Sequence, residues 1–191
     1  MREDPSNGYD AIAAEFMAAR SDTGRALVQR WAASLPSGGC VVDVGCGFGE
    51  PMTAALIEAG LSVWAIDASP AMVAAFKQQF ANVPVACEPA EHSRFFDRRF
   101  DAILAIGLIF LLPADRQRLL ITRFSAALKP AGRLLLSAPR QVGTWTDRLS
   151  GSVSTSLGEA AYRRLLSDAG LRLLASHSDE GGSHYYEAEK P

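Results

Sequence analysis

The sequence has few cysteines and no excess of positive charge. Its 191 residues contain only three cysteines, Cys40, Cys46 and Cys87, at irregular spacing. That number and spacing argue against a disulfide framework and favour reduced thiols in the cytoplasm. The net charge is −2, which leaves no basic surplus to hold a nucleic-acid backbone. We therefore expect a cytoplasmic protein with no nucleic-acid partner.

Long hydrophobic runs and metal-ligand patterns are also missing. The longest apolar run, residues 102–113, is too short to span a bilayer and is interrupted by Gly107. The first ten residues are acidic and polar, unlike a signal peptide. The three histidines and three cysteines do not have the spacing of metal ligands. We expect no membrane partner and no metal, and a monomer or homodimer needs no special feature.

Residues 41–51, VVDVGCGFGEP, are the most informative stretch. Three valines predict a buried strand, the glycines at 45, 47 and 49 predict a tight loop, and apolar residues at helical spacing follow. A strand, a glycine loop and a helix together form a ligand-binding crevice at the carboxyl end of a sheet. A nicotinamide-binding loop would have glycine where Glu50 stands, and a negative charge there disfavours a pyrophosphate.

The rest of the chain alternates strands and helices, which predicts a largely parallel α/β sheet. A turn at residues 179–182 then joins two strands as a hairpin, so the sheet should end in one antiparallel strand. Residues 9–33 should form two helices broken at residues 21–24, and residues 138–151 should be irregular. The expected strands are 41–44, 61–66, 83–86, 100–106, 133–137, 171–176 and 183–189, and the later helices are 51–59, one starting at 69–70, 116–128 and 158–169.

Asp67 ends the second expected strand, where an acid can accept hydrogen bonds from both hydroxyls of a ribose. Ser69 is the better-placed helix cap, which favours the ribose role for Asp67. With this residue the sequence resembles the class I S-adenosylmethionine-dependent methyltransferases. The segments that carry the resemblance are VVDVGCGFGEP, VWAIDASPAM, CEPAEHSRFFDRRFDAILAIGLIFLL and LKPAGRLLLSAP.

The resemblance extends over residues 9–189 and implies a Rossmann-like three-layer sandwich. Its sheet would have seven strands in the order 3-2-1-4-5-7-6, with strand seven antiparallel. Residues 1–36 would supply N-terminal lid and packing helices, and residues 37–191 would form the cofactor-binding core of a single overall domain. The cofactor would be S-adenosyl-L-methionine and the product S-adenosyl-L-homocysteine.

The resemblance also implies roles for particular residues at the cofactor. Asp43 would support the glycine loop, and the backbone of Gly45 and Ile106 would meet the methionine ammonium. An acid near Ala90 would hold the adenine amine, and both Glu88 and Glu91 are candidates for it. The full set expected at the cofactor is Asp43, Gly45, Cys46, Gly47, Gly49, Asp67, Ala68, Met72, Glu88, Ala90, Glu91 and Ile106.

The acceptor is expected to be a small molecule, methylated at nitrogen, oxygen or sulfur. Residues 106–110, IGLIF, contain neither the Pro-Pro-aromatic nor the Pro-Cys motif of the family's nucleic-acid enzymes. In-line geometry alone can supply about 7–11 kcal/mol of the barrier, so few catalytic groups are needed. The residues expected at the substrate are Tyr9, Phe16, Arg20, Phe110 and Trp145, although core packing or solvent exposure would also explain them.

Two residues near the C-terminus are candidate catalytic groups. Strand alternation places His184 and Tyr186 on one face, with Tyr185 on the other. His184 would act as a general base or orient the substrate, and a structural histidine is the competing interpretation. Two further functions stay open: methylation of a protein or free amino acid, and a cofactor-binding module that regulates or scaffolds a partner without turnover.

Overall fold

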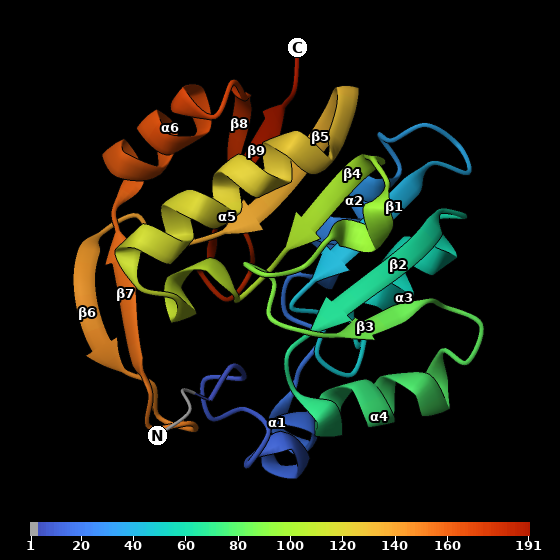
Figure 1. The fold of residues 1–191 in the computed structure, drawn as a ribbon, viewed down its shortest axis with the longest axis vertical. Helices are drawn as coiled ribbons and strands as arrows, with labels where there is room; N and C mark the ends of the chain where they lie inside the picture. The colour runs from blue at the N-terminus through green and yellow to red at the C-terminus, as the bar shows by residue number, and fades with distance from the viewer. Residues whose placement is uncertain (1–3) are drawn as a thin grey trace.

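The computed structural model describes residues 4–191 and is built on one seven-stranded sheet in the order β3-β2-β1-β4-β5-β9-β8 (Figure 1). The last strand, β9, pairs antiparallel with both of its neighbours, and the other pairs are parallel. The predicted order and the single antiparallel strand are therefore confirmed. The strands are β1 (Cys40–Val44), β2 (Ser62–Asp67), β3 (Val85–Cys87), β4 (Phe100–Ala105), β5 (Leu128–Ser137), β8 (Arg172–Ser178) and β9 (His184–Glu189).

Helices cover both faces of the sheet and produce the predicted three layers. Neighbouring residues of each central strand point to opposite faces: Val42 packs with Phe124 of α5, whereas Val41 packs with Val28 of α2. Figure 1 shows α5 in front of the sheet and α2 and α3 behind it. The helices are α1 (Ala13–Ala19), α2 (Arg25–Ala32), α3 (Met52–Glu58), α4 (Pro70–Gln79), α5 (Ala114–Ala127) and α6 (Glu159–Asp168), with short 3-10 turns η1 (Phe95–Asp97) and η2 (Ile109–Leu111).

Residues 1–36, predicted as lid and packing helices, contain two helices with different surroundings. Helix α2 belongs to the sandwich, because Val28 and Trp31 are buried against the sheet. Residues 5–10 precede α1 and lie near the carboxyl ends of the sheet strands. We call them the roof segment. Residues 1–3 of the expected lid lie outside the described residues.

The segment expected to be irregular after β5 is an antiparallel hairpin. Strands β6 (Val142–Thr146) and β7 (Val153–Leu157) pair only with each other and form a second, two-stranded sheet. Figure 1 shows this hairpin extending from the edge of the molecule toward the N-terminal segment. Several of its side chains are exposed, with Val142 at 79%, so the apolar burial that usually identifies a strand is weak here.

Two boundaries also differ from the sequence-based expectation. Helix α5 begins at Ala114, because Pro113 stands at the N-cap and Asp115 lies in the first turn. Strand β5 begins at Leu128, and the expected turn at residues 130–132 is an irregularity within it, where the register with β4 shifts. Neither change moves the carboxyl ends of the strands, where the site lies.

Candidate active site

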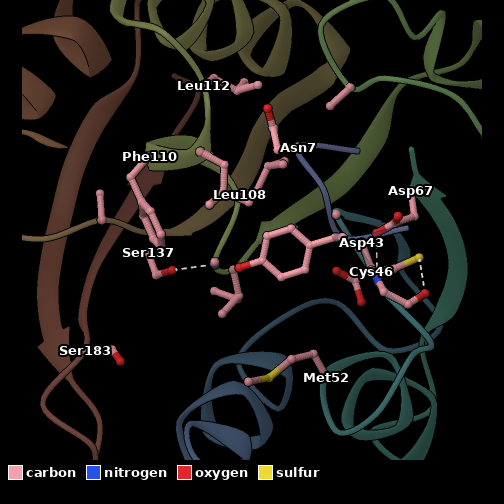
Figure 2. A pocket seen from close by; sticks show the side chains of 18 of the residues that line it. Asn7, Asp43, Cys46, Met52, Asp67, Leu108, Phe110, Leu112, Ser137 and Ser183 are labelled. Atoms are coloured by element: carbon pink, nitrogen blue, oxygen red, sulfur yellow. Dashed lines mark hydrogen bonds between the residues drawn. The ribbon is translucent and has the colours of Figure 1, made fainter. Parts of the chain in front are cut away.

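A cavity of about 520 Å³ opens at the carboxyl ends of the central strands. Its walls come from the roof segment, the glycine loop, the chain after β4 and β5, and the start of β9. In Figure 2, Asp43, Cys46 and Asp67 lie on one side of the cavity, and Phe110, Ser137 and Ser183 lie on the other. The cavity therefore has two ends, each built from different strands.

The glycine loop forms the floor of the first end. Gly47 has a left-handed backbone with φ of 56°, and a Cβ placed on it would have no heavy atom within 4 Å. Gly47 lines the cavity, so that open space is available to a ligand. Its amide donates a 2.8 Å hydrogen bond to Oδ2 of Asp67, which ties the loop to the end of β2.

Asp67 is held in place by two backbone amides. Besides the bond from Gly47, its Oδ1 accepts a 2.8 Å hydrogen bond from the Ser69 amide. Burial raises the pKa of Asp67, although these backbone hydrogen bonds act in the opposite direction. Ser69 caps α4 by accepting a hydrogen bond from the Met72 amide, as predicted, so the carboxylate of Asp67 is oriented toward the cavity and is not the cap.

Asp43 lies beneath the loop and is almost fully buried. Burial raises its pKa to about 7, even though Oγ1 of Thr53 donates a 2.6 Å hydrogen bond to the carboxylate. Cys46 lies nearby, and burial raises the pKa of its thiol well above the ordinary value. The Cys46 thiol donates to the Gly47 carbonyl at 3.4 Å, so it is an unreactive part of the loop.

The two acidic candidates for the adenine differ in their partners. Both Glu88 and Glu91 line the cavity, together with Ala90 and Met72. Glu91 is buried and forms an ion pair with Arg116 at 3.4 Å. Within residues 4–191, the Glu88 carboxylate forms no hydrogen bond or ion pair, and its backbone amide donates to the Asp67 carbonyl at 2.9 Å. Glu88 is therefore the acid whose carboxylate is available to a ligand beside Asp67.

The opposite end of the cavity combines an aromatic wall with polar groups. Phe110, in η2 after β4, lines it and packs against Trp145 of β6 with ring centroids 5.6 Å apart. Ser137 ends β5, and its Oγ accepts a 2.8 Å hydrogen bond from the Gly107 amide, drawn as a dashed line in Figure 2. Ile106 lines the cavity between the two ends.

His184 is the most unusual polar residue at this end. It begins β9, lines the cavity and is only 8% exposed, yet neither ring nitrogen has a hydrogen-bond partner within the described residues. Burial, followed by the positive charge of Arg140, lowers its pKa. His184 is therefore a buried imidazole in the cavity wall, and its two ring nitrogens are themselves buried.

The roof segment lines part of the cavity and contacts both the hairpin and α4. The Tyr9 hydroxyl donates to Oδ2 of Asp147 at 3.4 Å, and Oγ of Ser152 donates to the Asn7 carbonyl at 2.7 Å. Burial raises the pKa of Tyr9 to about 12, so it remains a neutral donor. Oδ1 of Asp10 accepts from Oγ of Ser69 at 2.7 Å and from the Ala71 amide at 2.8 Å.

Two more predicted substrate residues line the cavity near the roof. Phe16 of α1 packs edge-on against Tyr9, with ring centroids 5.4 Å apart. Burial raises the pKa of Asp43 and of Tyr185, and the positive charge of Arg20 offsets part of that rise at both groups. Arg20 therefore carries its charge close to the cofactor loop as well as to β9.

Three predicted site residues do not line the cavity. Gly49 packs under α4, where a Cβ would overlap the Phe80 ring. Trp145 supports Phe110 from behind. Tyr186 is fully buried between the rings of His184 and Tyr162, with centroids 4.7 Å and 5.6 Å away. Tyr186 therefore does not make the expected catalytic contact in the cavity, because its ring is buried against His184.

The structure adds cavity residues that the sequence analysis missed. Tyr185, on the other face of β9, lines the cavity and donates a 2.7 Å hydrogen bond to Oδ2 of Asp179. Asp147 lies in the hairpin turn; burial would raise its pKa, but hydrogen bonds led by that from the Ser150 amide lower it overall. Val and Thr at every second position in residues 142–146 and 153–155 are typical of strands, and this pattern could have predicted the hairpin.

The residues at the first end fit a nucleoside-containing sulfonium ligand. Asp67 and Glu88 would offer carboxylates to a ribose and an adenine, Met72 would offer an apolar contact, and Gly47 leaves open space beside the cavity. Ala68 and Ala90 complete the small, apolar lining there. No group of three or more His, Cys, Asp or Glu within residues 4–191 is arranged to hold a metal ion.

The strand order and the helices on both faces of the sheet define a Rossmann-like fold of the methyltransferase type. More particularly, residues 41–132 match the family model described as a methyltransferase domain. The match and the fold agree with the resemblance and the methyltransferase class stated from the sequence, and S-adenosylmethionine as the cofactor stays a prediction. A search against curated proteins finds no match.

Solved structures of methyltransferases share the fold over nearly the whole chain. The 1,6-didemethyltoxoflavin N1-methyltransferase of Burkholderia thailandensis has a TM-score of 0.70 and 22% identity, covering 100% of this chain and 92% of its own. The magnesium protoporphyrin IX methyltransferase of Synechocystis has a TM-score of 0.77 and 17% identity, covering 100% and 99%. The CcbJ methyltransferase of Streptomyces caelestis has a TM-score of 0.81 and 16% identity, covering 99% of each chain.

Proposed function

We propose that this chain methylates a nitrogen, oxygen or sulfur atom of a small molecule. The observation that carries the proposal is the single cavity that joins the cofactor end to a roofed acceptor end containing Phe110 and His184. A roofed cavity suits a small acceptor better than a nucleic acid or a folded protein. The toxoflavin and protoporphyrin enzymes named above act on small molecules, which supports the same substrate class here.

The mechanism we infer depends mainly on position. When bound, S-adenosylmethionine would supply an activated methyl group to the acceptor. Asp67 and Glu88 hold the nucleoside, while the backbone of Gly45 and Ile106 faces the methionine part. The roof segment excludes water.

The acceptor end also explains the supporting residues. Phe110 and Phe16 provide apolar contact, Arg20 provides a positive charge, and Trp145 and Tyr186 hold Phe110 and His184 in position. No helix among residues 4–191 is long and apolar enough to cross a membrane. The three free cysteines suit a reducing compartment, and we propose a cytoplasmic monomer or homodimer.

Calorimetry with S-adenosylmethionine and S-adenosylhomocysteine is the first test, followed by a small-molecule panel assayed with isotopically labelled methyl donor and mass spectrometry. We expect both cofactor forms to bind and label to appear on a small acceptor. Absence of binding by folded protein would refute the proposal. Binding without transfer to any small molecule would instead favour the regulatory module, and labelling of proteins or free amino acids would favour that alternative substrate class.

A further inference from the structure

A second hollow, of about 460 Å³, lies apart from the cofactor cavity, and no residue lines both. It is formed by the chain between β3 and β4 together with the C-terminal half of α5. We call it the arginine hollow, because four of its lining residues are arginines and only one is acidic. Its charged lining consists of Arg94, Asp97, Arg98, Arg99 and Arg123.

The acidic residue of the arginine hollow neutralises only one of the four arginines. Nε and Nη2 of Arg94 donate to Oδ1 of Asp97, at 2.9 Å and 2.8 Å. Within residues 4–191, Arg98, Arg99 and Arg123 form no ion pair with a carboxylate. Three guanidinium groups at one hollow therefore keep their positive charge without a counter-ion from the protein.

Two of these guanidinium groups are held by aromatic rings and a carbonyl instead of carboxylates. Cζ of Arg98 lies 4.0 Å from the centroid of the Trp64 ring. Cζ of Arg123 lies 5.9 Å from the centroid of the Phe95 ring, and its Nη2 donates a hydrogen bond to the Ser93 carbonyl. Contact with a ring orients a guanidinium group without occupying all of its N–H donors. Both arginines are therefore partly ordered before any ligand binds.

The backbone beside the arginine hollow adopts a conformation that is costly for its residues. Phe95, Phe96 and Asp97 have φ of 50°, 56° and 53°, the left-handed region that disfavours side chains. The Arg98 amide closes this turn by donating to the Phe95 carbonyl at 3.2 Å, and the Phe95 ring packs on Phe124 of α5 with centroids 6.2 Å apart. Such strain persists where surrounding contacts hold it, and it is common at binding sites.

We propose that the arginine hollow binds a phosphate group, either as inorganic phosphate or as the phosphomonoester of a small molecule. A phosphomonoester carries a charge of about −1.5 to −2 at pH 7 and has three acceptor oxygens. This charge and number of oxygens suit three guanidinium groups without carboxylate partners. The planar fork of arginine also matches phosphate oxygens in pairs. A carboxylate offers one charge and two oxygens, and would leave more of the positive charge uncompensated.

The dimensions and charge of the molecule favour a small phosphate compound over a nucleic acid. A volume of about 460 Å³ is in the range of pockets that bind small ligands. A nucleic acid is held by many phosphate contacts along its backbone, and the whole chain has a net charge of −2. The arginine hollow is separate from the methyl-transfer cavity, so this inference does not depend on the proposed function.

The test measures binding of inorganic phosphate and of glycerol 3-phosphate to the full chain at one fixed ionic strength. In NMR titrations of ¹⁵N-labelled protein, the amide signals of residues 93–99 should shift and reach saturation. The probe that binds more tightly tells whether the hollow takes the free ion or the ester. Malonate, a dianion with two carboxylates, is the control, and we expect it to bind at least about tenfold more weakly than phosphate.

Substitutions at the arginines show whether the hollow is the binding site. Arg98→Gln and Arg123→Gln should each weaken binding of the tighter probe about tenfold or more, because each removes a charged hydrogen-bond donor. Arg164→Gln, at an exposed arginine of α6 outside the hollow, should bind that probe normally. An unchanged Tm shows that a variant is folded. Because Arg123 also holds the Ser93 carbonyl, Arg98→Gln decides the test if Arg123→Gln fails to fold.

Several results would overturn the proposal. Malonate binding as tightly as phosphate would show an unselective basic surface, and equal phosphate affinity in Arg98→Gln and the parent chain would place the site elsewhere. An oligonucleotide that binds at residues 93–99 and is not displaced by phosphate would favour a nucleic-acid partner instead. None of these results bears on methyl transfer, which is tested by cofactor binding in the other cavity.

Discussion

Asp67 accepts hydrogen bonds from the Gly47 and Ser69 amides and keeps lone pairs for a ribose. Replacing it by asparagine removes the charge and one accepting oxygen, and hydrogen bonds to a charged group contribute about 1.5–3 kcal/mol. We expect Asp67→Asn to weaken S-adenosylhomocysteine binding about ten- to a hundredfold in calorimetry. The matched control Asp168→Asn, at an exposed acid in α6, should bind normally. Equal affinities would exclude the ribose role.

His184 should lower the stability of the folded chain at acid pH. Burial, with Arg140, holds its pKa below the ordinary value, so the unfolded chain takes up a proton more readily than the folded chain. The free energy of unfolding should therefore fall as pH decreases below about 6.5. In His184→Gln, chemical denaturation across this pH range should show a smaller fall. A fall of the same size in the variant would belong to another group.

Gly47 and Gly49 look equivalent in the sequence but have different tasks. A Cβ at Gly49 would overlap Phe80 of the core, whereas one at Gly47 would enter the cavity. We expect Gly49→Ala to lower the free energy of unfolding by about 1–3 kcal/mol in chemical denaturation. Gly47→Ala should mainly weaken S-adenosylhomocysteine binding. The reverse pattern would contradict this assignment.

Individual residues could be predicted from the sequence where a local pattern determined their role. Asp67 was recognisable because strand and helix signals surround it, and Ser69 because it precedes Pro70. Tyr185 was missed, and Tyr186 was favoured in its place. Alternation along β9 identified two faces, but which face approaches the cavity depends on the helices that pack on each side.

At the scale of elements, the roof segment is held to the start of α4 by the side chain of Asp10. Asp10 accepts hydrogen bonds from Ser69 and the Ala71 amide, so Asp10→Ala should release residues 5–10 from α4. A lost capping interaction costs about 1 kcal/mol. Hydrogen exchange of amides 6–10 should become faster, while α4 keeps its Ser69 cap and exchanges as before. Unchanged exchange in the roof segment would show that other contacts hold it.

Elements with buried apolar patterns were predictable, and the exposed ones were not. The seven sheet strands and six helices follow from apolar spacing, glycine and proline signals, with small boundary shifts at α5 and β5. The β6–β7 hairpin escaped because Val142, Trp145 and Val153 are exposed. Its position over the cavity comes from long-range contacts with the roof segment, which no local pattern records.

At the scale of the whole molecule, cofactor binding should raise the free energy of unfolding. A ligand that binds only the folded state adds about 2.7 kcal/mol at a hundred times its Kd. For a chain of this size that corresponds to a rise in Tm of about 5–10 °C. Thermal unfolding with and without S-adenosylhomocysteine measures the shift, and adenosine alone should give a smaller one. An unchanged Tm at saturating ligand would contradict binding to the folded state.

At the same scale, the fold and the cofactor were largely predictable, and the acceptor was not. The cofactor end is built from consecutive segments around residues 41–72, whose spacing can be read directly. The acceptor end brings together residues as distant as Tyr9, Phe110, Asp147 and His184. These residues come together because β5 pairs with β9 and because the hairpin contacts the roof segment, and neither contact is visible in a local sequence pattern.

The roof segment is attached at both ends of the cavity, so the release of the cofactor product and the release of the methylated product should depend on the same movement. Asp10 holds it beside the nucleoside end, and Asn7 and Tyr9 hold it to the hairpin over the acceptor end. One detachment therefore uncovers both exits, and the spent cofactor and the methylated product leave in the same opening. We therefore expect kcat to follow the frequency of that opening, as in enzymes whose product release depends on a closing segment.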